Sequence, residues 1–500
     1  MHIGESNRDW RLGATNRKFS VWRRSPRTGA PEAPRHNWTA LLLFFALLLI
    51  PCYWQTRIQS ADLSSHIYNA WLTSQVRRGE IPGLWISSQR NNILFDLMLE
   101  WLLLHVGLNL AQRLAVSIAV LIFGWGAIRF IFRIAGYNWW IAPWVAMLAY
   151  GFVFHLGLFN FYLSLGLCLW YLALFWGGTW GIRALAAPIL VLAWIAHPFP
   201  VVWTVCTAAY ISIANAVRVR LQLALLLLGL TVVVSAHLFL IHRYAYSWSF
   251  DQLSLITGAN QIVLFGMKYV PLFVGLLLIA MMLLHVLIKR FGLAGLIRTI
   301  PVQLWLLNAA AVLLIPDRVL FPQFGRPLGY IAQRLSLAAG LMLCAALASA
   351  PAPRFAKVAL VSVALLFFGL LYTDERALNR MEDKLDTAVD QLPRGQRVVS
   401  LLPSQSLASL CLHHDLDRAC IGQCWSYANY EPASWQFRLR ALPGNGIVLD
   451  NDADVAAAAG GKYIVQPRDL PVFLIYLCGM ESRDICWRPL LIGQTTGNPN

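Results

Sequence analysis

Apolar side chains form a series of long runs along this 500-residue chain. Each run approaches the roughly 20 residues that an α-helix needs to cross a bilayer. A β-barrel would instead show shorter segments in which apolar and polar side chains alternate. The pattern therefore predicts an all-α polytopic membrane protein. About eleven transmembrane helices are expected, at residues 39–54, 93–107, 113–133, 139–155, 159–177, 184–210, 219–241, 269–289, 300–315, 332–350 and 355–372.

The composition agrees with a membrane protein. Hydrophobic residues make up 58% of the chain, charged residues make up 13%, and the mean hydropathy is +0.57. A soluble domain typically carries about 25% charged residues. This shortage of charge excludes a disordered chain, a coiled coil, a collagen and a set of cytosolic domains.

The positive charge belongs to the first three quarters of the chain. Residues 374–500 contain 12 Lys and Arg against 15 Asp and Glu, which leaves 28 basic and 9 acidic residues before them. The high pI is therefore a property of the membrane part, where basic loops set topology and contact anionic lipids. Because no surface with interleaved basic and aromatic residues is evident, we expect membrane lipids as partners and no nucleic acid.

The basic N-terminus sets the expected orientation. Residues 1–38 are polar and carry eight Lys and Arg, which predicts a disordered cytoplasmic tail before the transmembrane domain at 39–373. Three basic loops then fall inside, as the positive-inside rule requires: 211–220, 290–298 and 351–357. Three loops fall outside together with residues 374–500: 55–92, 242–268 and 316–331.

Two features fit this topology less well. Three basic residues fall on the outer side: Arg129, Arg133 and Arg183. The segment 184–210 contains His197-Pro198-Phe199-Pro200, and two short helices there would reverse the direction of every later span. The same topology puts the loop at 133–139 outside and the turn near 151–162 in the cytoplasm.

Residues 374–500 are expected to form a small α/β domain outside the membrane. Residues 397–402 and 462–465 are typical of strands, and the glycines at 444–446 and 460–461 are typical of turns. Five cysteines suit an oxidising compartment, with two disulfides and one thiol left over. A metal site through Cys411, His413 or His414, Cys420 and Cys424 is the alternative, but this spacing is not a recognised zinc pattern.

Asp62 is the most informative acid, because acidic side chains near a bilayer are costly and need a reason. It follows the first span by eight residues and precedes an amphipathic stretch, with Leu63, Ile67, Ala70, Trp71 and Ser74 on one helical face. We expect a helix along the membrane surface, with His66 four residues after Asp62 and on the same side. The alternative is a helix-capping aspartate with an interfacial histidine.

This arrangement resembles the GT-C class of multi-spanning glycosyltransferases. The shared features are a basic tail, one helix, and a long outside loop with an early Asp and a surface helix. The resemblance implies a polyprenyl-phosphate-linked sugar as donor and a glycan, lipid or protein as acceptor. It implies a bacterial inner membrane location with residues 374–500 in the periplasm. It also implies that Asp62 is a base or a metal-linked orienter, so a divalent ion is a candidate cofactor. We further expect His66, Tyr68 and Asn69, on the helix after Asp62, to contact substrate.

The chain departs from that class in one respect. Many members carry a second acid in the next outside loop, and residues 133–139 contain none. Asp96 and Glu100 could supply this acid, because their spacing of four residues puts them on one helical face. Two close carboxylates suit acid–base catalysis. The alternative is a buried pair neutralised by nearby basic residues, namely Arg90, Arg113 or His105.

The outer loop at 316–334 supplies candidate ligands for a lipid phosphate. Arg318, Arg326 and Arg334 offer planar donors that stay charged. Arg334 falls inside the next span and should face a polar cavity. The alternatives are an ion pair with Asp317 and snorkelling to lipid headgroups. His197 is either a cavity-lining group or a hydrogen-bonded core histidine.

Two other functions remain open at this stage. A transporter or lipid flippase would use Asp62 and the arginines as gating or headgroup contacts; the break at 197–200 favours this, and the lack of an internal repeat argues against it. An assembly factor would dock partners through residues 374–500. The sequence contains no Walker, GxGxxG or HExxH motif, so nucleotide-driven transport, Rossmann cofactors and zincin chemistry have no support.

Overall fold

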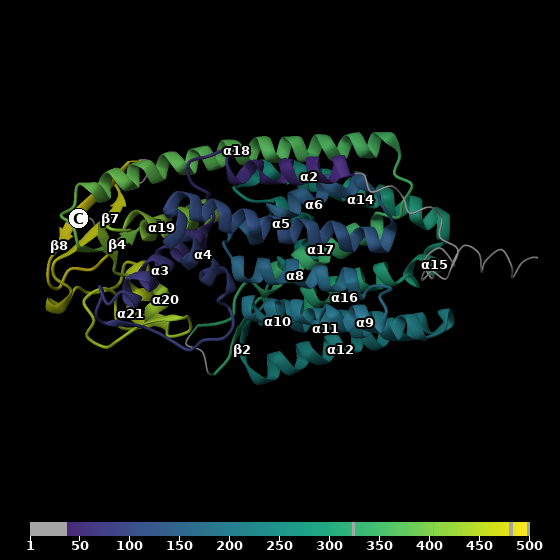
Figure 1. The fold of residues 1–500 in the computed structure, drawn as a ribbon, viewed down its shortest axis with the longest axis horizontal. Helices are drawn as coiled ribbons and strands as arrows, with labels where there is room; N and C mark the ends of the chain where they lie inside the picture. The colour runs from purple at the N-terminus through teal and green to yellow at the C-terminus, as the bar shows by residue number, and fades with distance from the viewer. Residues whose placement is uncertain (1–37, 323–325, 404, 480–483, 498–500) are drawn as a thin grey trace, which may run out of the picture.

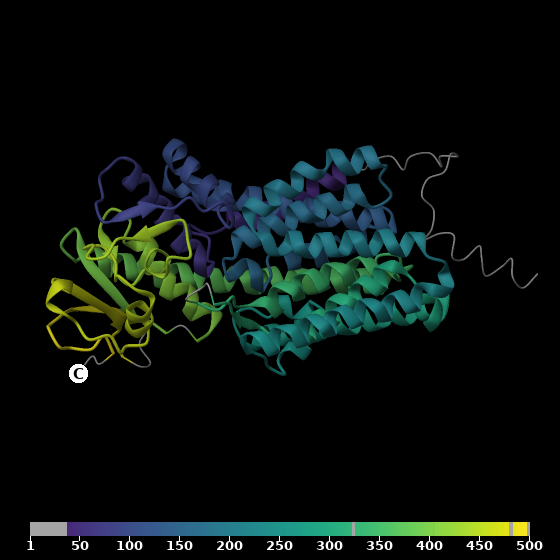
Figure 2. The ribbon, with the colours of Figure 1, turned by 90° about the horizontal axis from the view of Figure 1, so that it is seen from below.

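The computed structural model describes residues 38–322, 326–403, 405–479 and 484–497. The protein is mostly helical and elongated (Figure 1). A helical bundle occupies one part of the long axis, and a mixed helix and strand region occupies the other (Figure 1 and Figure 2). The helix α18 (Arg354–Asp390) runs along both parts. The expected boundary at residue 374 lies inside this continuous helix.

The bundle contains helices of two lengths. Five helices are long and apolar enough to cross a membrane: α5 (Leu108–Ala135), α11 (Pro198–Ala216), α12 (Gln222–Arg243), α14 (Val270–Phe291) and α18. Shorter apolar helices run beside them: α2 (Trp38–Leu49), α6 (Ala142–Ala149), α7 (Phe152–His155), α8 (Phe159–Phe175), α10 (Ala187–Ala196), α16 (Ile300–Leu314) and α17 (Ile331–Leu347).

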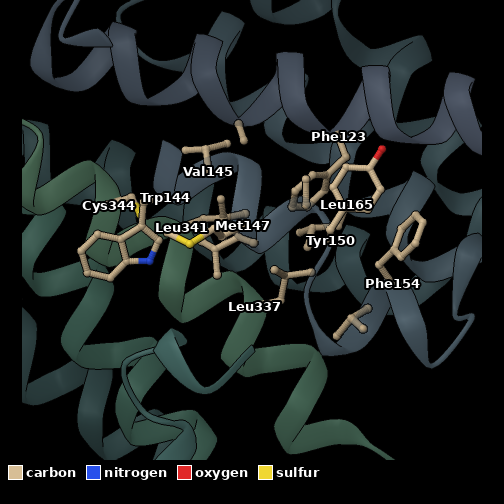
Figure 3. Close-up of a cluster of buried hydrophobic side chains, with 14 of the residues drawn as sticks. Phe123, Trp144, Val145, Met147, Tyr150, Phe154, Leu165, Leu337, Leu341 and Cys344 are labelled. Atoms are coloured by element: carbon tan, nitrogen blue, oxygen red, sulfur yellow. The ribbon is translucent and has the colours of Figure 1, made fainter. Parts of the chain in front are cut away.

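Close packing of α5 against α8 forms the centre of the bundle. Gly126 and Gly166 lie at this contact, and a Cβ on Gly126 would come within 2.5 Å of the Gly166 carbonyl oxygen. Small residues let membrane helices approach closely, which increases their van der Waals contact. Large apolar side chains from α5, α6, α7, α8 and α17, including Phe123, Trp144 and Leu337, fill the adjacent core (Figure 3).

The expected span at 93–107 is wrong. This segment forms α4 (Leu94–Val106), which is not among the helices apolar enough to cross a membrane. Its Glu100 pairs with Arg77 at 2.5 Å and with Arg438 at 2.8 Å. Because both partners lie outside the bundle, α4 belongs to the layer between the bundle and the C-terminal region.

The expected single span at 184–210 is also wrong. α10 ends at Ala196 and α11 begins at Pro198, with His197 in an extended conformation between them. Proline lacks the N–H that would continue the helix, and it restricts the residue before it to extended backbone. Losing one span at 93–107 and gaining one here leaves the direction of all later helices unchanged.

Between these two positions, the helix directions are the reverse of the expected ones. The turn near 151–158 therefore lies at the bundle end next to the C-terminal region, where the Leu156 carbonyl accepts a hydrogen bond from the Asp62 amide. The loop at 133–139 lies at the opposite end, where Asn138 donates to the carbonyl of Ala348, directly after α17. Both placements correct the sequence-based topology.

The amphipathic helix expected after Asp62 is present as α3 (Ala61–Arg77). It does not lie open on a surface. Most of its length is buried, because α4 covers one side and α19 (Leu407–Ala419) covers another. The following strand β1 (Leu84–Ile86) pairs with β6 (Leu439–Ala441), which joins the loop after the first helix to the C-terminal region.

The C-terminal region contains a four-stranded mixed sheet in the order β5-β4-β7-β8. The predicted strand at 397–402 is β4 (Gln396–Leu401), whereas 462–465 forms no strand apart from one isolated bridge. The other strands are β5 (Cys424–Ser426), β7 (Val472–Leu477) and β8 (Ile485–Leu490), and the short helices are α20 (Tyr430–Ser434) and α21 (Asp452–Ala459). Outside this region, β2 (Ala245–Ser247) pairs with β3 (Arg318–Leu320).

The prediction of two disulfides and one remaining thiol is confirmed. Cys420 bonds to Cys424 and Cys478 bonds to Cys486, while Cys411 stays free and buried. The alternative zinc site is incompatible with this pairing, because two of its ligands form a disulfide with each other.

A buried ion pair joins the C-terminal region to the bundle. Arg418 of α19 makes a two-pronged contact with Glu382 of α18, at 2.6 and 2.7 Å. Its remaining N–H groups donate to the Ile58 carbonyl, the Gln112 side chain and Asp415. One guanidinium therefore contacts α18, α5 and the loop before α3.

Replacing Arg418 by Gln should destabilise the protein by about 3–5 kcal/mol, because the buried Glu382 would lose its two-pronged partner and keep, among the described residues, only Arg57 as a counter-ion, whose Nε atom lies 3.5 Å away. The apparent unfolding midpoint in detergent measures this. The matched control is Lys384→Gln, which removes a solvent-exposed pair with Asp484 and should cost no more than about 1 kcal/mol. The prediction is wrong if the two variants lose the same stability.

Candidate functional site

Asp62 lies at the end of the bundle that faces the C-terminal region. It occupies the first turn of α3, and its amide donates to the Leu156 carbonyl at 3.2 Å. The neighbouring Gly157 has φ +86°, and a Cβ there would come within 2.5 Å of the Asp62 nitrogen. Glycine is thus needed both for the backbone conformation and for the close approach of the turn. This contact fixes the start of α3 against the bundle.

The C-terminal region contributes charged groups directly opposite Asp62. The His414 Nε2 atom lies 3.5 Å from an Asp62 carboxylate oxygen, and its Nδ1 atom lies 3.8 Å from Asp417. The ring of Tyr430 packs edge-on against His414. Burial lowers the pKa of His414, but the nearby carboxylates of Asp417 and Asp62 raise it by more, so the net pKa lies above its ordinary value.

A second cluster lies one turn along α3. The His66 Nδ1 atom is 2.6 Å from Asp96 of α4, and Asp96 also accepts a hydrogen bond of 2.8 Å from Asn160. Burial lowers the pKa of His66, but the adjacent Asp96 carboxylate, with Glu431 and Asp62 further away, raises it to about 9. His66 is therefore an imidazolium at neutral pH.

Glu431 of α20 completes this cluster from the C-terminal region. It lies 3.9 Å from His66, and its buried Oε1 atom has no hydrogen-bond partner among the described residues. Burial raises the pKa of Glu431 well above its ordinary value, against the opposing effect of His66. A buried polar atom without a partner is costly, and this one is adjacent to Asp96.

Arg334 supplies a buried cation to the same end of the bundle. Its side chain is on the first turn of α17, with the guanidinium carbon 5.5 Å from the centroid of the Phe161 ring. Its Nε and Nη1 atoms are buried and have no hydrogen-bond partner among the described residues. Asp62 and Asp317 lie close enough for their charges to act on it. Two free donors on a buried guanidinium suit an incoming anionic group.

We call this group of residues the Asp62 site: Asp62, His66, Asp96, Arg334, His414, Asp417 and Glu431. The two other arginines expected at a phosphate behave differently. Arg326 forms an ion pair with Asp452 and lies over the Tyr430 ring, at the edge of the site. Arg318 is about half exposed and lies near Asp317 and Tyr330.

Four further residues expected in the site are occupied by structural contacts. Tyr68 accepts a hydrogen bond from the Ser426 amide, and Asn69 accepts one from Asn429; both join α3 to the C-terminal region. His197 caps α11 by accepting from the Phe199 amide. Glu100 forms the ion pairs that hold α4. This agrees with the alternative of a buried acid neutralised by basic residues, although its partners differ from the expected ones.

The described residues offer no ready metal centre. Among them, no group of three or more His, Cys, Asp or Glu side chains is arranged to hold a metal ion. The divalent ion expected at Asp62 therefore has no matching set of ligands among these residues.

Sequence reasoning did not place His414, Asp417 or Glu431 beside Asp62. The first two belong to the segment 413–417 (HHDLD), which was considered only as part of a zinc site. Their signal was weak, because charged side chains are ordinary in a water-facing region and only the fold brings them to Asp62.

Comparison with known proteins gives no relative. No family model matches the chain, and neither a curated protein nor a solved structure matches it. The site must therefore be interpreted from its own chemistry.

His66 should make stability depend on pH. Its folded pKa of about 9 exceeds the unfolded value of about 6.5, so its contribution, on the order of 3 kcal/mol, is complete below pH 6.5 and is lost as pH rises through 9. The midpoint difference between wild type and His66→Gln should therefore shrink between pH 7 and 10. His105→Gln, at an exposed position on α4, is the control, and a constant difference for His66→Gln would refute the assignment.

Proposed function

We propose that this protein is a membrane glycosyltransferase of the GT-C class. It transfers a sugar from a polyprenyl-phosphate donor to a glycan, lipid or protein acceptor. The observation that carries the proposal is the presence of two charged groups at the same end of the bundle. Asp62 is partly exposed and offers a carboxylate, while Arg334 is buried and has two nitrogen atoms without a hydrogen-bond partner among the described residues. A base for the acceptor and a cation for the leaving phosphate are the two charges that such a transfer requires.

The proposed topology has eleven spans, with the N-terminus in the cytoplasm. The six acids between residues 38 and 373 support this, because all lie at the bundle end next to the C-terminal region: Asp62, Glu80, Asp96, Glu100, Asp251 and Asp317. The opposite end carries basic residues: Arg129, Arg133, Arg183, Arg218, Arg220, Lys289, Arg290, Arg298, Arg354 and Lys357. The three arginines that opposed the sequence-based topology now obey the positive-inside rule.

In this topology the Asp62 site faces the outer side of a bacterial inner membrane, with the C-terminal region in the periplasm. The donor lipid presents its phosphate at the same depth as Arg334, which is at the outer end of α17. The proposed site therefore lies where a lipid headgroup and a water-borne acceptor can meet.

The reaction uses the residues in two roles. Asp62 accepts the proton of the acceptor hydroxyl as that oxygen attacks the anomeric carbon of the sugar. The bond from the anomeric carbon to the phosphate oxygen breaks, and the electron pair leaves with the lipid phosphate. Arg334 donates hydrogen bonds to that phosphate and stabilises the charge that develops on it. No step passes through a metal ion.

Replacing Asp62 by Asn should abolish most of the transfer. General-base catalysis contributes about 10²–10⁴-fold, so the loss of radiolabel transfer from a panel of polyprenyl-phosphate sugars should fall in that range. Membranes containing wild type, Asp62→Asn or Glu80→Gln provide the comparison. Glu80 is an exposed residue of the same loop, paired with Arg78, and its variant should transfer sugar like wild type.

The same assay separates the competing functions. Equal transfer by folded Asp62→Asn and wild type would remove Asp62 from the mechanism. No transfer by folded wild type from any donor would refute the transferase. In that case, movement of fluorescent lipid across reconstituted vesicles would test for a flippase.

Arg334 should affect the chemical step more than substrate binding. Because it stabilises charge that develops as the phosphate leaves, Arg334→Gln should lower kcat by about 10²–10³-fold and raise KM for the donor much less. Arg243→Gln is the control, since Arg243 is exposed at the same end of the bundle, where α12 ends. A variant with normal kcat and a raised KM would assign Arg334 to ground-state binding alone.

A further inference from the structure

His414 lies between two carboxylates from different parts of the chain. Its Nε2 atom faces Asp62 of α3 at 3.5 Å, and its Nδ1 atom faces Asp417 of α19 at 3.8 Å. Asp417 is itself held by a hydrogen bond of 2.5 Å from the Ser426 hydroxyl at the end of β5. The ring is almost completely buried, and Tyr430 packs against it. A chain of contacts therefore runs from the sheet of the C-terminal region to Asp62.

We propose that His414, held by Asp417, is a positioning residue that orients the Asp62 carboxylate for the acceptor. The role rests on the proposed glycosyl transfer. It makes the C-terminal region a part of the active site, because the residue that fixes the base comes from outside the bundle. His414 keeps its proton throughout the reaction, and the acceptor proton goes to Asp62.

The ring chemistry favours the doubly protonated form. A neutral imidazole carries one N–H and one lone pair, so it would turn a lone pair towards one of the two carboxylates. An imidazolium presents an N–H group and positive charge to both carboxylates. Burial opposes this charge, and Asp417 and Asp62 outweigh burial, in agreement with the raised pKa of His414.

The adjacent histidine behaves in the opposite way. The Nδ1 atom of His413 lies 3.3 Å from the Ser400 hydroxyl. Burial and the charge of His414 lower the pKa of His413 to about 4, so it is neutral at physiological pH. His413 is therefore a matched control, since it has the same side chain on the same helix and a different partner.

Other titratable groups face Asp62 and His414, and the test must separate them. They come from every element around the pair: Cys411, His413 and Asp415 of α19, His66 of α3, Tyr430 and Glu431 of α20, and Tyr330 and Arg334 at the start of α17. A pH effect is therefore assigned to His414 only if the His414 variant removes it.

The first experiment does not depend on activity. The full-length protein, labelled with ¹³C at the histidine Cε1 positions, is titrated in detergent micelles, and His414→Gln identifies the His414 signal. Asp62→Asn should lower the pKa of His414 by about 1–2 pH units, because it removes one of the two carboxylates. In His413→Gln, the His414 signal should keep its raised pKa. A His414 pKa that Asp62→Asn does not change overturns the proposed contact.

The second experiment measures transfer. His414→Gln should lower kcat by about 10- to 100-fold, since a slightly misplaced base loses this much, and should leave KM for the donor unchanged. Wild-type kcat should decline as His414 deprotonates at alkaline pH, and this decline should be absent in His414→Gln and present in His413→Gln. Unchanged kcat in a folded His414→Gln, or an alkaline decline that persists in it, overturns the positioning role. A titration that behaves as expected without transfer from any donor refutes the glycosyltransferase, and with it this role.

Discussion

The buried pair between Arg418 and Glu382 determines where everything around the site can lie. Glu382 is in the part of α18 that extends beyond the bundle, and Arg418 is on α19 of the C-terminal region. A guanidinium this deeply buried is stable only when its partner and its remaining donors are in place. Here they come from α18, from α5 through Gln112, and from the loop before α3 through the Ile58 carbonyl. The pair therefore locks the C-terminal region to the bundle in one orientation.

That orientation also sets the position of His414. One turn of α19 separates His414 from Arg418, so anchoring the arginine on α18 fixes the height and rotation of the histidine. Asp415 lies beside them and bonds to the Ser64 hydroxyl of α3. The same helical face thus contacts both α18 and α3. Asp62 is held from the other side by the turn at Gly157. Asp62 and His414 lie next to each other because two separate contacts, one on each side, fix their positions.

The sequence predicted those charged residues of the site that lie in or near apolar segments, where a bilayer makes charge costly. Asp62 and Arg334 stood out because charges in or near apolar segments are rare, and the amphipathic helix after Asp62 followed from periodicity alone. The same cost of buried charge argues against a span at 93–107, because this segment contains Asp96 and Glu100. His414 and Glu431 could not be found in this way, because a polar surface region contains many such residues. Their importance comes from long-range contacts, which only the packing of α19 and α20 determines.

The two errors in the span count cancel each other, so the expected direction of the later helices is unchanged. The segment 93–107 contains an apolar run that suggests a span in spite of its two acids, and the apolar run at 184–210 hides the break at Pro198. Each error reverses the helix direction, so the pair restores it from α11 onwards. Only the helices between the two positions were reversed. Those helices carry the turn at Gly157 and the Phe161 ring next to Arg334. The hydropathy and charge rules therefore give the relative direction of the helices from α11 onwards, and they misplace the segments that carry Gly157 and Phe161 beside the Asp62 site.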